Sequence, residues 1–199
     1  PGEFNVYNAL AAISVAKAYG INFEVCKKAL EKTKGIAGRM EVIQKEPFEV
    51  IVDYAHTPEQ LEAVYKSLSP KSYILNPNLI CVLGSCGGGR DKWKRPVLGQ
   101  IAAKYCKEII VTNEDPYDEN PSQILSEIKS GISKPEARNP KLHEILDRKE
   151  AIKKAVLIAK SGDTVIITGK GSEPWMCVAN GKKIPWSDRQ IVRDALQKE

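Results

Sequence analysis

The sequence has little of what would mark a membrane, secreted or metal-binding protein. Its 199 residues include two histidines, two methionines and 7% aromatic residues. No apolar run approaches the roughly 20 residues that a transmembrane helix needs, and no secretory signal is visible at the N-terminus. We therefore expect a globular protein of the cytoplasm.

The five cysteines form no recognisable metal or disulfide pattern. They are odd in number, none belongs to a C-x-x-C pair, and two histidines are too few for the usual zinc sites. Cys81 and Cys177 lie in apolar segments that resemble strands, where a free cysteine behaves as a small core residue. The sequence thus predicts reduced thiols and no metal site.

The positive charge does not indicate nucleic acid or a membrane as a partner. The formal net charge is +5, but pairs such as Lys27-Lys28 and Lys153-Lys154 are spread over helical segments and are not gathered with aromatic residues. A hydrophobic content of 42% with 28% charged residues is typical of a folded domain with its own core.

Hydrophobic periodicity divides the chain into two parts. It predicts helices over residues 5–19 and 23–33, after which glycines at 35 and 38 interrupt the pattern. We place a domain boundary there, with residues 1–38 ending one domain and residues 39–199 forming another. Because the chain starts with Pro1 and a helical pattern follows almost at once, we expect a fragment of a longer protein.

Strands and helices alternate beyond residue 38. Strands are expected at 50–53, 79–83, 108–111, 142–145 and 163–167, with helices between them and a last helix after Ser187. Thr57 and Ser187 read as N-caps, and Asn180-Gly181 reads as a hairpin turn. The strands are continuously apolar, which predicts an α/β, Rossmann-like fold with a mostly parallel sheet and helices on both faces.

The segment from Gly84 to Pro96 reads GSCGGGRDKWKRP. Glycines let backbone N–H groups approach a ligand, and the start of the following helix adds free donors, so the segment suits an anionic group. It is not a Walker A loop, because Arg90-Asp91 stands where Lys-Ser/Thr is required, and it lacks G-x-G-x-x-G. A flexible strand-to-helix connection is the alternative interpretation.

Polar residues also follow the other strands, at 53–58, 112–117 and 168–173. Ligands of parallel sheets gather at the carboxyl ends of strands, so the four segments together predict a binding crevice. Each has a structural alternative: His56 as part of a helix end, Asp53 as a turn cap, and Asn113–Pro116 as an ordinary proline turn. Lys170, between two glycines, favours contact with an anion.

Six motifs, in this order, resemble those of Mur ligases, most closely of the MurE type. They are Gly38–Glu41, Asp53–Pro58, Gly87–Pro96, Asn113–Pro116, Gly169–Glu173 and Ser187–Arg189. The resemblance implies an ATP-dependent peptide ligase of peptidoglycan synthesis. Such an enzyme adds a diamino acid to UDP-N-acetylmuramoyl-L-alanyl-D-glutamate through an acyl phosphate. It also implies that residues 1–38 are the C-terminal helices of a central ATP-binding domain and that 39–199 bind the amino acid.

The resemblance assigns roles to residues of this chain. Expected nucleotide contacts are Asn5, Asn8, Arg39, Asp53 and His56; expected amino-acid contacts are Arg90, Glu114, Asp115, Tyr117, Gly169 and Glu173; Asp91, Lys92 and Arg95 are expected to order the loop or face phosphate. ATP and Mg²⁺ are the implied cofactors, bound mainly by a central domain that these 199 residues lack. No catalytic residue is assigned, and the chain by itself is expected to be inactive.

Two departures from the family pattern affect the expected substrate and site. MurE-type enzymes that use meso-diaminopimelate typically read Asp-Asn-Pro-Arg where this chain has Glu114-Asp-Pro-Tyr117. The missing arginine favours L-lysine or L-ornithine over diaminopimelate, because tyrosine cannot supply two charged donors. Ser172 stands where histidine is usual. Two other classes remain open: a related ligase of the folylpolyglutamate or cyanophycin synthetase type, and a non-catalytic module that binds an amino acid or nucleotide.

Overall fold

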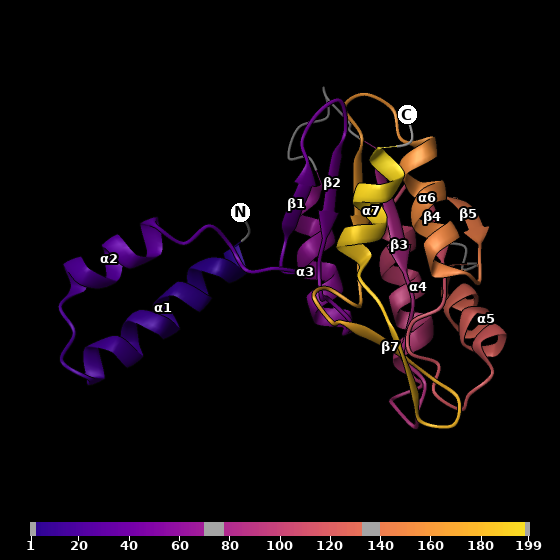
Figure 1. Ribbon diagram of the computed structural model, residues 1–199, viewed down its shortest axis with the longest axis horizontal. Helices are drawn as coiled ribbons and strands as arrows, with labels where there is room; N and C mark the ends of the chain where they lie inside the picture. Colours follow the sequence, from indigo (N-terminus) through magenta and orange to yellow (C-terminus); the bar gives the residue numbers. More distant parts are fainter. Residues whose placement is uncertain (1–2, 70–77, 133–139, 198–199) are drawn as a thin grey trace. The chain divides into compact units, whose positions relative to one another are not determined.

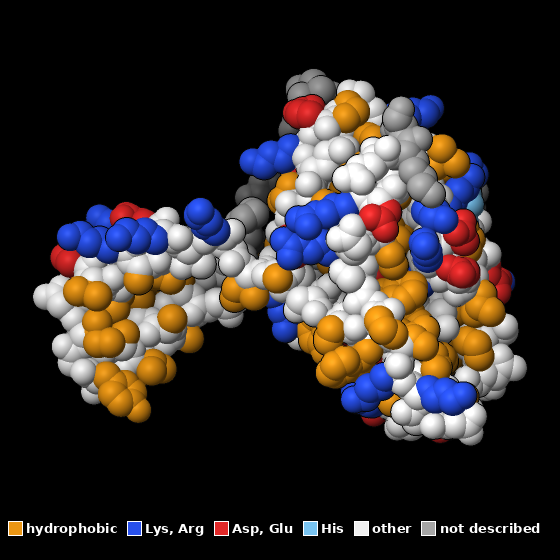
Figure 2. Space-filling view, in the orientation of Figure 1, with side chains coloured by type: hydrophobic (Ala, Val, Ile, Leu, Met, Phe, Trp, Pro, Cys, Tyr) orange, Lys and Arg blue, Asp and Glu red, His pale blue; other side chains and the backbone are white. Residues whose placement is uncertain are grey.

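The computed structural model describes residues 3–69, 78–132 and 140–197, which form two compact units, Pro1–Ile36 and Ala37–Glu199 (Figure 1). The first unit contains α1 (Glu3–Ala18) and α2 (Phe23–Glu31). Asn22 caps α2 by accepting a hydrogen bond from the backbone N–H of Glu24 at 2.8 Å. Apolar side chains gather along one side of this helix pair, and its lysines lie along the other (Figure 2).

The second unit is built on a six-stranded sheet in the order β1-β2-β6-β3-β4-β5. The strands are β1 (Glu41–Gln44), β2 (Glu49–Val52), β3 (Leu79–Leu83), β4 (Glu108–Val111), β5 (Lys141–Glu144) and β6 (Thr164–Ile167). Only β1, which the sequence analysis missed, runs antiparallel to its neighbour. The mostly parallel α/β fold is therefore confirmed.

Helices cover both faces of this sheet. One core packs α3 (Pro58–Leu68), α4 (Lys94–Tyr105) and α5 (Pro121–Ile132) on one face, and a second packs α6 (Arg148–Ile158) and α7 (Asp188–Leu196) on the other (Figure 1). Successive β3 residues alternate between the two cores, with Cys81 in the first and Val82 in the second. Burial on both faces explains the continuously apolar strands. Within the described residues, no helix is long and apolar enough to cross a bilayer.

The predicted local signals coincide with the observed turns and caps. The Thr57 hydroxyl accepts from the Gln60 N–H, and the Ser187 hydroxyl accepts from the Gln190 N–H at 3.2 Å. The hairpin β7 (Trp175–Val178) and β8 (Lys182–Pro185) turns at Asn180 and Gly181, whose φ angles are 61° and 66°. Two residues with positive φ are what a tight hairpin turn requires.

One prediction about the cysteines is wrong. Cys81 of β3 and Cys106, which follows α4, form a disulfide with their Cα atoms 6.1 Å apart. Cys26, Cys86 and Cys177 are free thiols, so reduced cysteines are found at three of five positions. The sequence did not indicate the pair because the two residues meet only when α4 packs against the sheet.

Candidate functional site

The polar segments that follow four strands emerge at one edge of the sheet. The register pairs Val52 of β2 with Ile167 of β6, and Leu83 of β3 with Val111 of β4. β3 and β6 are neighbours, yet the helices that follow them pack on opposite faces. This is the arrangement in which open parallel sheets bind ligands. We call residues 53–58, 84–95, 112–117 and 168–173 the rim.

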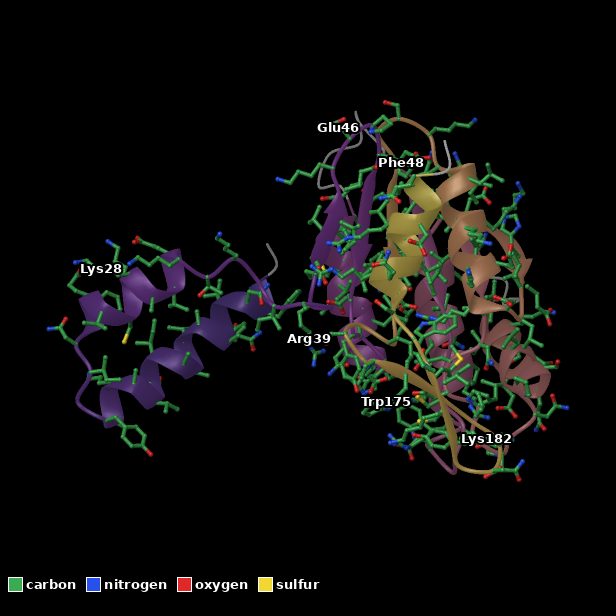
Figure 3. All side chains as sticks on the ribbon, viewed as in Figure 1. Lys28, Arg39, Glu46, Phe48, Trp175 and Lys182 are labelled. Carbon is green, nitrogen blue, oxygen red and sulfur yellow. A yellow bond between two sulfur atoms is a disulfide. The ribbon has the colours of Figure 1, made fainter. Side chains whose placement is uncertain are left out.

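Arg39, which precedes β1, lies beside two aromatic rings that follow β2. The Arg39 guanidinium carbon is 4.3 Å from the centre of the Tyr54 ring, and the Tyr54 and His56 rings meet edge to face at 4.8 Å. His56 Nδ1 is 2.9 Å from the Tyr54 carbonyl oxygen, which can only accept, so Nδ1 donates. Two predicted nucleotide contacts, Arg39 and His56, thus flank one tyrosine. In Figure 3, Arg39 and Trp175 lie toward the end of the unit opposite Glu46 and Phe48.

Asp53, a predicted nucleotide contact, is 5% exposed, and its carboxylate accepts hydrogen bonds from the protein backbone. Oδ2 accepts from the Met40 N–H and Oδ1 from the Ala55 N–H, each at 2.7 Å. These bonds hold the turn after β2 against the segment that carries Arg39. The Asp53 carboxylate therefore positions the two backbone segments that it joins.

The glycine-rich segment is fastened to the segment that follows β4. The Gly87 N–H donates to the Asp115 carbonyl at 2.9 Å, and a Cβ on Gly88 would lie 2.8 Å from the Tyr117 ring. The exposed Arg90 lies close enough to Tyr117 for its charge to act on the phenol. A hydrogen bond with Cys177 and burial nevertheless raise the pKa of Tyr117. Arg90, Asp115 and Tyr117 are thus brought to the same part of the rim.

Arg95 holds the base of the glycine-rich segment. It is fully buried and donates to Glu127 at 2.7 Å, to Glu119 at 3.0 Å and to the Cys86 carbonyl at 3.1 Å. Hydrogen bonds from Arg95 lower the pKa of Glu127. Lys92 also pairs with Glu119, at 3.3 Å, but its side chain is mostly exposed. Asp91 is exposed as well.

Glu114 is a buried residue of the rim. It is 2% exposed, and a Cβ added to Gly84 or to Gly169 would overlap its side chain. The Cys86 thiol donates to its Oε1 at 3.2 Å. Burial raises the pKa of Glu114, although the charge of Arg148 opposes the shift. Gly169, with φ of 107°, has no room for a side chain, so only its backbone can face a ligand.

Glu173 is the one carboxylate of the last rim segment, and it is partly exposed. Its Oε1 accepts from the Tyr54 hydroxyl at 2.9 Å, and its Oε2 accepts from Lys170 Nζ at 2.6 Å, while 36% of the side chain stays exposed. Lys170 also donates to Asp115 Oδ2 at 2.7 Å. The sequence predicts that Lys170 contacts an anionic ligand, but its ammonium is already paired with two carboxylates of the protein.

The sequence analysis missed Arg148 as part of this region. It is 2% exposed, donates through two nitrogens to Asp188 at 2.9 and 2.7 Å, and donates to the Thr168 carbonyl at 2.7 Å. A weaker bond of 3.4 Å reaches the Asn113 carbonyl. Arg148 thus ties the starts of α6 and α7 to the ends of β4 and β6. The Ser187–Arg189 motif was a signal for Asp188, but nothing in the sequence indicated its partner.

A second missed residue is Ser85, which is the second residue after the end of β3. It is 2% exposed, and its hydroxyl has no hydrogen-bond partner in the part of the chain that the structure describes. The two predicted asparagines belong to the other unit, where Asn8 Nδ2 donates to Asn5 Oδ1 at 3.3 Å.

Comparison with known proteins identifies the family. The family model described as "Mur ligase, glutamate ligase domain" matches residues 38–171, which is more than half of the chain. The chain belongs to the Mur ligase family. The match covers the rim of this Mur ligase domain from the segment after β2 as far as Gly171, and it ends before Glu173.

Curated relatives of the Mur ligase domain are similar over nearly all of its length. The UDP-N-acetylmuramoyl-L-alanyl-D-glutamate--2,6-diaminopimelate ligases of Thermosynechococcus vestitus and Aquifex aeolicus are 41% and 42% identical to it, and both matches cover 98% of the chain. A UDP-N-acetylmuramyl-tripeptide synthetase of Roseiflexus is 42% identical over the same share. The chain spans 38% of the length of each of these relatives.

Solved structures agree with the fold. A structure of a UDP-N-acetylmuramoyl-L-alanyl-D-glutamate--2,6-diaminopimelate ligase superposes with a TM-score of 0.72 at 37% identity, covering 99% of this chain and 39% of that one. A UDP-N-acetylmuramate-alanine ligase from Thermotoga maritima gives a TM-score of 0.63 at 21% identity, covering 100% and 38%. The second likeness shows the fold alone.

Proposed function

We propose that this Mur ligase domain binds the incoming diamino acid in an ATP-dependent ligase that extends UDP-N-acetylmuramoyl-L-alanyl-D-glutamate. The observation that carries the proposal is Glu173, a partly exposed carboxylate held on both oxygens at the rim. Asp115 links it through Lys170 to the part of the rim that carries Arg90. The names of the relatives support the same reaction, amide formation with a diamino acid.

The charges of the rim match the two ends of a diamino acid. The planar guanidinium of Arg90, exposed on the glycine-rich segment, suits the carboxylate of the amino acid. Glu173 suits the distal ammonium. Gly169 is buried against the Glu114 side chain, and a contact between its backbone and the amino acid stays a prediction. In this proposal the remaining amine attacks an acyl phosphate of the dipeptide substrate, and phosphate leaves.

The residues of this chain fit a nucleotide only in part. ATP, when bound, supplies the phosphoryl group that activates the carboxylate of the dipeptide. Arg39 is exposed and His56 is partly exposed, so both fit as contacts, whereas the Asp53 carboxylate is engaged by two backbone amides. In the described residues, no group of three or more His, Cys, Asp or Glu is placed to hold a metal. The proposal therefore places the Mg²⁺ ligands outside this domain.

The choice of diamino acid stays a prediction. Tyr117 brings no cation to the rim, which favours L-lysine or L-ornithine, whereas several relatives are named for 2,6-diaminopimelate.

Two other functions are tested alongside this ligase reaction. A Mycobacterium tuberculosis folylpolyglutamate synthase has the same fold at 19% identity and a TM-score of 0.60, covering 84% of this chain and 38% of that one. A non-catalytic binding module is the other.

The direct test is amide formation by the full-length product of the gene that encodes this domain. With ATP, UDP-N-acetylmuramoyl-L-alanyl-D-glutamate and one of the three diamino acids, we expect equal amounts of ADP and tripeptide product, measured by liquid chromatography. The control is the same assay with the 199-residue chain in place of the full-length protein, and this chain should form no tripeptide product. A full-length protein that binds a diamino acid yet forms no amide would establish the binding module instead.

A further inference from the structure

Lys170 is an ammonium buried between two carboxylates of different strand ends. Its side chain is 1% exposed, and Nζ lies 2.7 Å from Asp115 Oδ2 and 2.6 Å from Glu173 Oε2. Burial acts to lower the pKa of Lys170, but hydrogen bonds with Asp115 and Glu173 outweigh it and raise that pKa. Lys170 therefore stays charged and has no exposed face for a ligand of its own.

Asp115 is held in place from the opposite side. Its Oδ1 accepts from the Cys177 N–H of β7 at 2.7 Å. Its backbone φ is 34°, a value that residues other than glycine rarely adopt. Strained backbone of this kind persists where surrounding contacts enforce it and is common at ligand sites. Lys170 is thus fixed at one end by a rigid partner, and its other contact is Glu173.

The second oxygen of Glu173 is held by Tyr54. The phenol donates to Oε1 at 2.9 Å, and the Arg39 guanidinium lies over the same ring. A carboxylate has about four lone-pair positions, and these two bonds use two of them. Because 36% of the Glu173 side chain is exposed, the others are available to a donor from solvent or from a ligand.

The net charge of the cluster formed by Asp115, Lys170 and Glu173 attracts a cation. Asp115, Glu173 and Lys170 together carry one net negative charge when all three are ionised. The buried pair of Arg148 and Asp188 offers a contrast, because both side chains are 0% exposed and both are bonded only within the protein. A pair with a purely structural role has that closed form, whereas the Lys170 cluster leaves one carboxylate open.

We propose that Lys170 and Tyr54 are positioning residues that hold Glu173 in the orientation that accepts the distal ammonium of the diamino acid. The inference rests on the proposed function and adds the source of its specificity. In this proposal Lys170 and Tyr54 act on the distal amine through Glu173, so they determine preference for a distal amine and not the reaction with the first amine.

The experiment compares each diamino acid with its analogue lacking the distal amine in the full-length ligase. L-lysine is paired with L-norleucine, and meso-diaminopimelate with 2-aminopimelate. In Lys170→Met and Tyr54→Phe, the preference for the diamino acid in kcat/KM should fall about tenfold to hundredfold, as expected for loss of a charged hydrogen bond. The kcat/KM for the analogue should change little. Lys153→Met, which removes an exposed ion pair with Glu150, is the matched control.

A double-mutant cycle separates positioning from a structural role. In the Glu173→Gln background, Lys170→Met should cause no further loss of preference, because its effect passes through the missing carboxylate. Tyr54→Phe retains the ring beneath Arg39, and it provides the test of positioning if Lys170→Met fails to fold. An unchanged preference in an active, folded Tyr54→Phe or Lys170→Met enzyme overturns the inference alone. A wild-type ligase that forms no amide overturns both it and the proposed function.

Discussion

At the scale of single residues, the second unit buries charges and pairs most of them. Arg95, Arg148 and Lys170 are each at most 2% exposed, and each donates to at least one carboxylate. Glu114 differs, because the side chain that donates to it is the neutral thiol of Cys86. Burying a carboxylate with such weak compensation disfavours its charged form, which is why burial raises its pKa.

Glu114→Gln tests this burial through the pH dependence of stability. A carboxyl with a raised folded-state pKa favours folding below its unfolded pKa, and that contribution is lost as the pH rises through the folded value. The stability of the variant relative to wild type should therefore increase with pH from the ordinary carboxyl range upward, measured by urea unfolding of the 199-residue chain. Glu150→Gln, an exposed carboxylate, should show no such trend. A parallel pH dependence of wild type and Glu114→Gln would contradict the argument.

At the scale of elements, α4 and α5 pack through glycines. A Cβ on Gly99 of α4 would overlap the Ile128 carbonyl oxygen, and one on Gly131 of α5 would overlap the Pro96 carbonyl oxygen. Glycine costs helix stability relative to alanine, so its presence in both helices reflects this close approach. The contact fixes α4, which carries Arg95, against α5, which carries its partner Glu127.

Gly99→Ala should therefore destabilise the domain although alanine is the better helix former. We expect a loss of about 1–3 kcal/mol, typical of overpacking, seen as a lower Tm in thermal unfolding followed by circular dichroism. Ser130→Ala on the exposed side of α5 is the control and should leave the Tm nearly unchanged. Equal Tm values for wild type and Gly99→Ala would show that the helices separate at little cost.

At the scale of the whole molecule, both hydrophobic cores belong to the second unit. All their residues lie between Met40 and Leu196, whereas Cys26 is the one buried apolar side chain among the described residues of the first unit. Exposed apolar residues such as Val6, Leu10 and Val15 line α1. The stability of the second unit should thus not depend on residues 1–36.

A chain of residues 37–199 should fold by itself with the Tm of the full 199 residues, within about 2 °C. The physical reason is that its core and sheet are complete without α1 and α2. Differential scanning calorimetry of both chains measures this, and a chain of residues 1–36 serves as the comparison, with no cooperative transition expected. A clearly lower Tm for residues 37–199 would show that the helix pair supports the domain.

Local signals explain which parts of the fold were predictable. Leu79–Leu83 and Glu108–Val111 were located residue for residue, because apolar runs bounded by polar residues depend only on neighbours in sequence. The strand β1 was missed because EVIQ is short and half polar, and it is a strand only through pairing with β2. An edge strand of this kind has no strong local pattern.

The sequence by itself determined the order of the strands and helices apart from β1, the caps at Thr57 and Ser187, and the edge of the sheet where polar residues gather. Periodicity and capping act over a few residues, so one chain suffices to read them. Only the tertiary structure decided that Lys170 pairs with Asp115, 55 residues away, and that Cys81 bonds to Cys106, 25 residues away. Such partners are brought together by packing of whole elements, and burial then sets their charge and their freedom to meet a ligand.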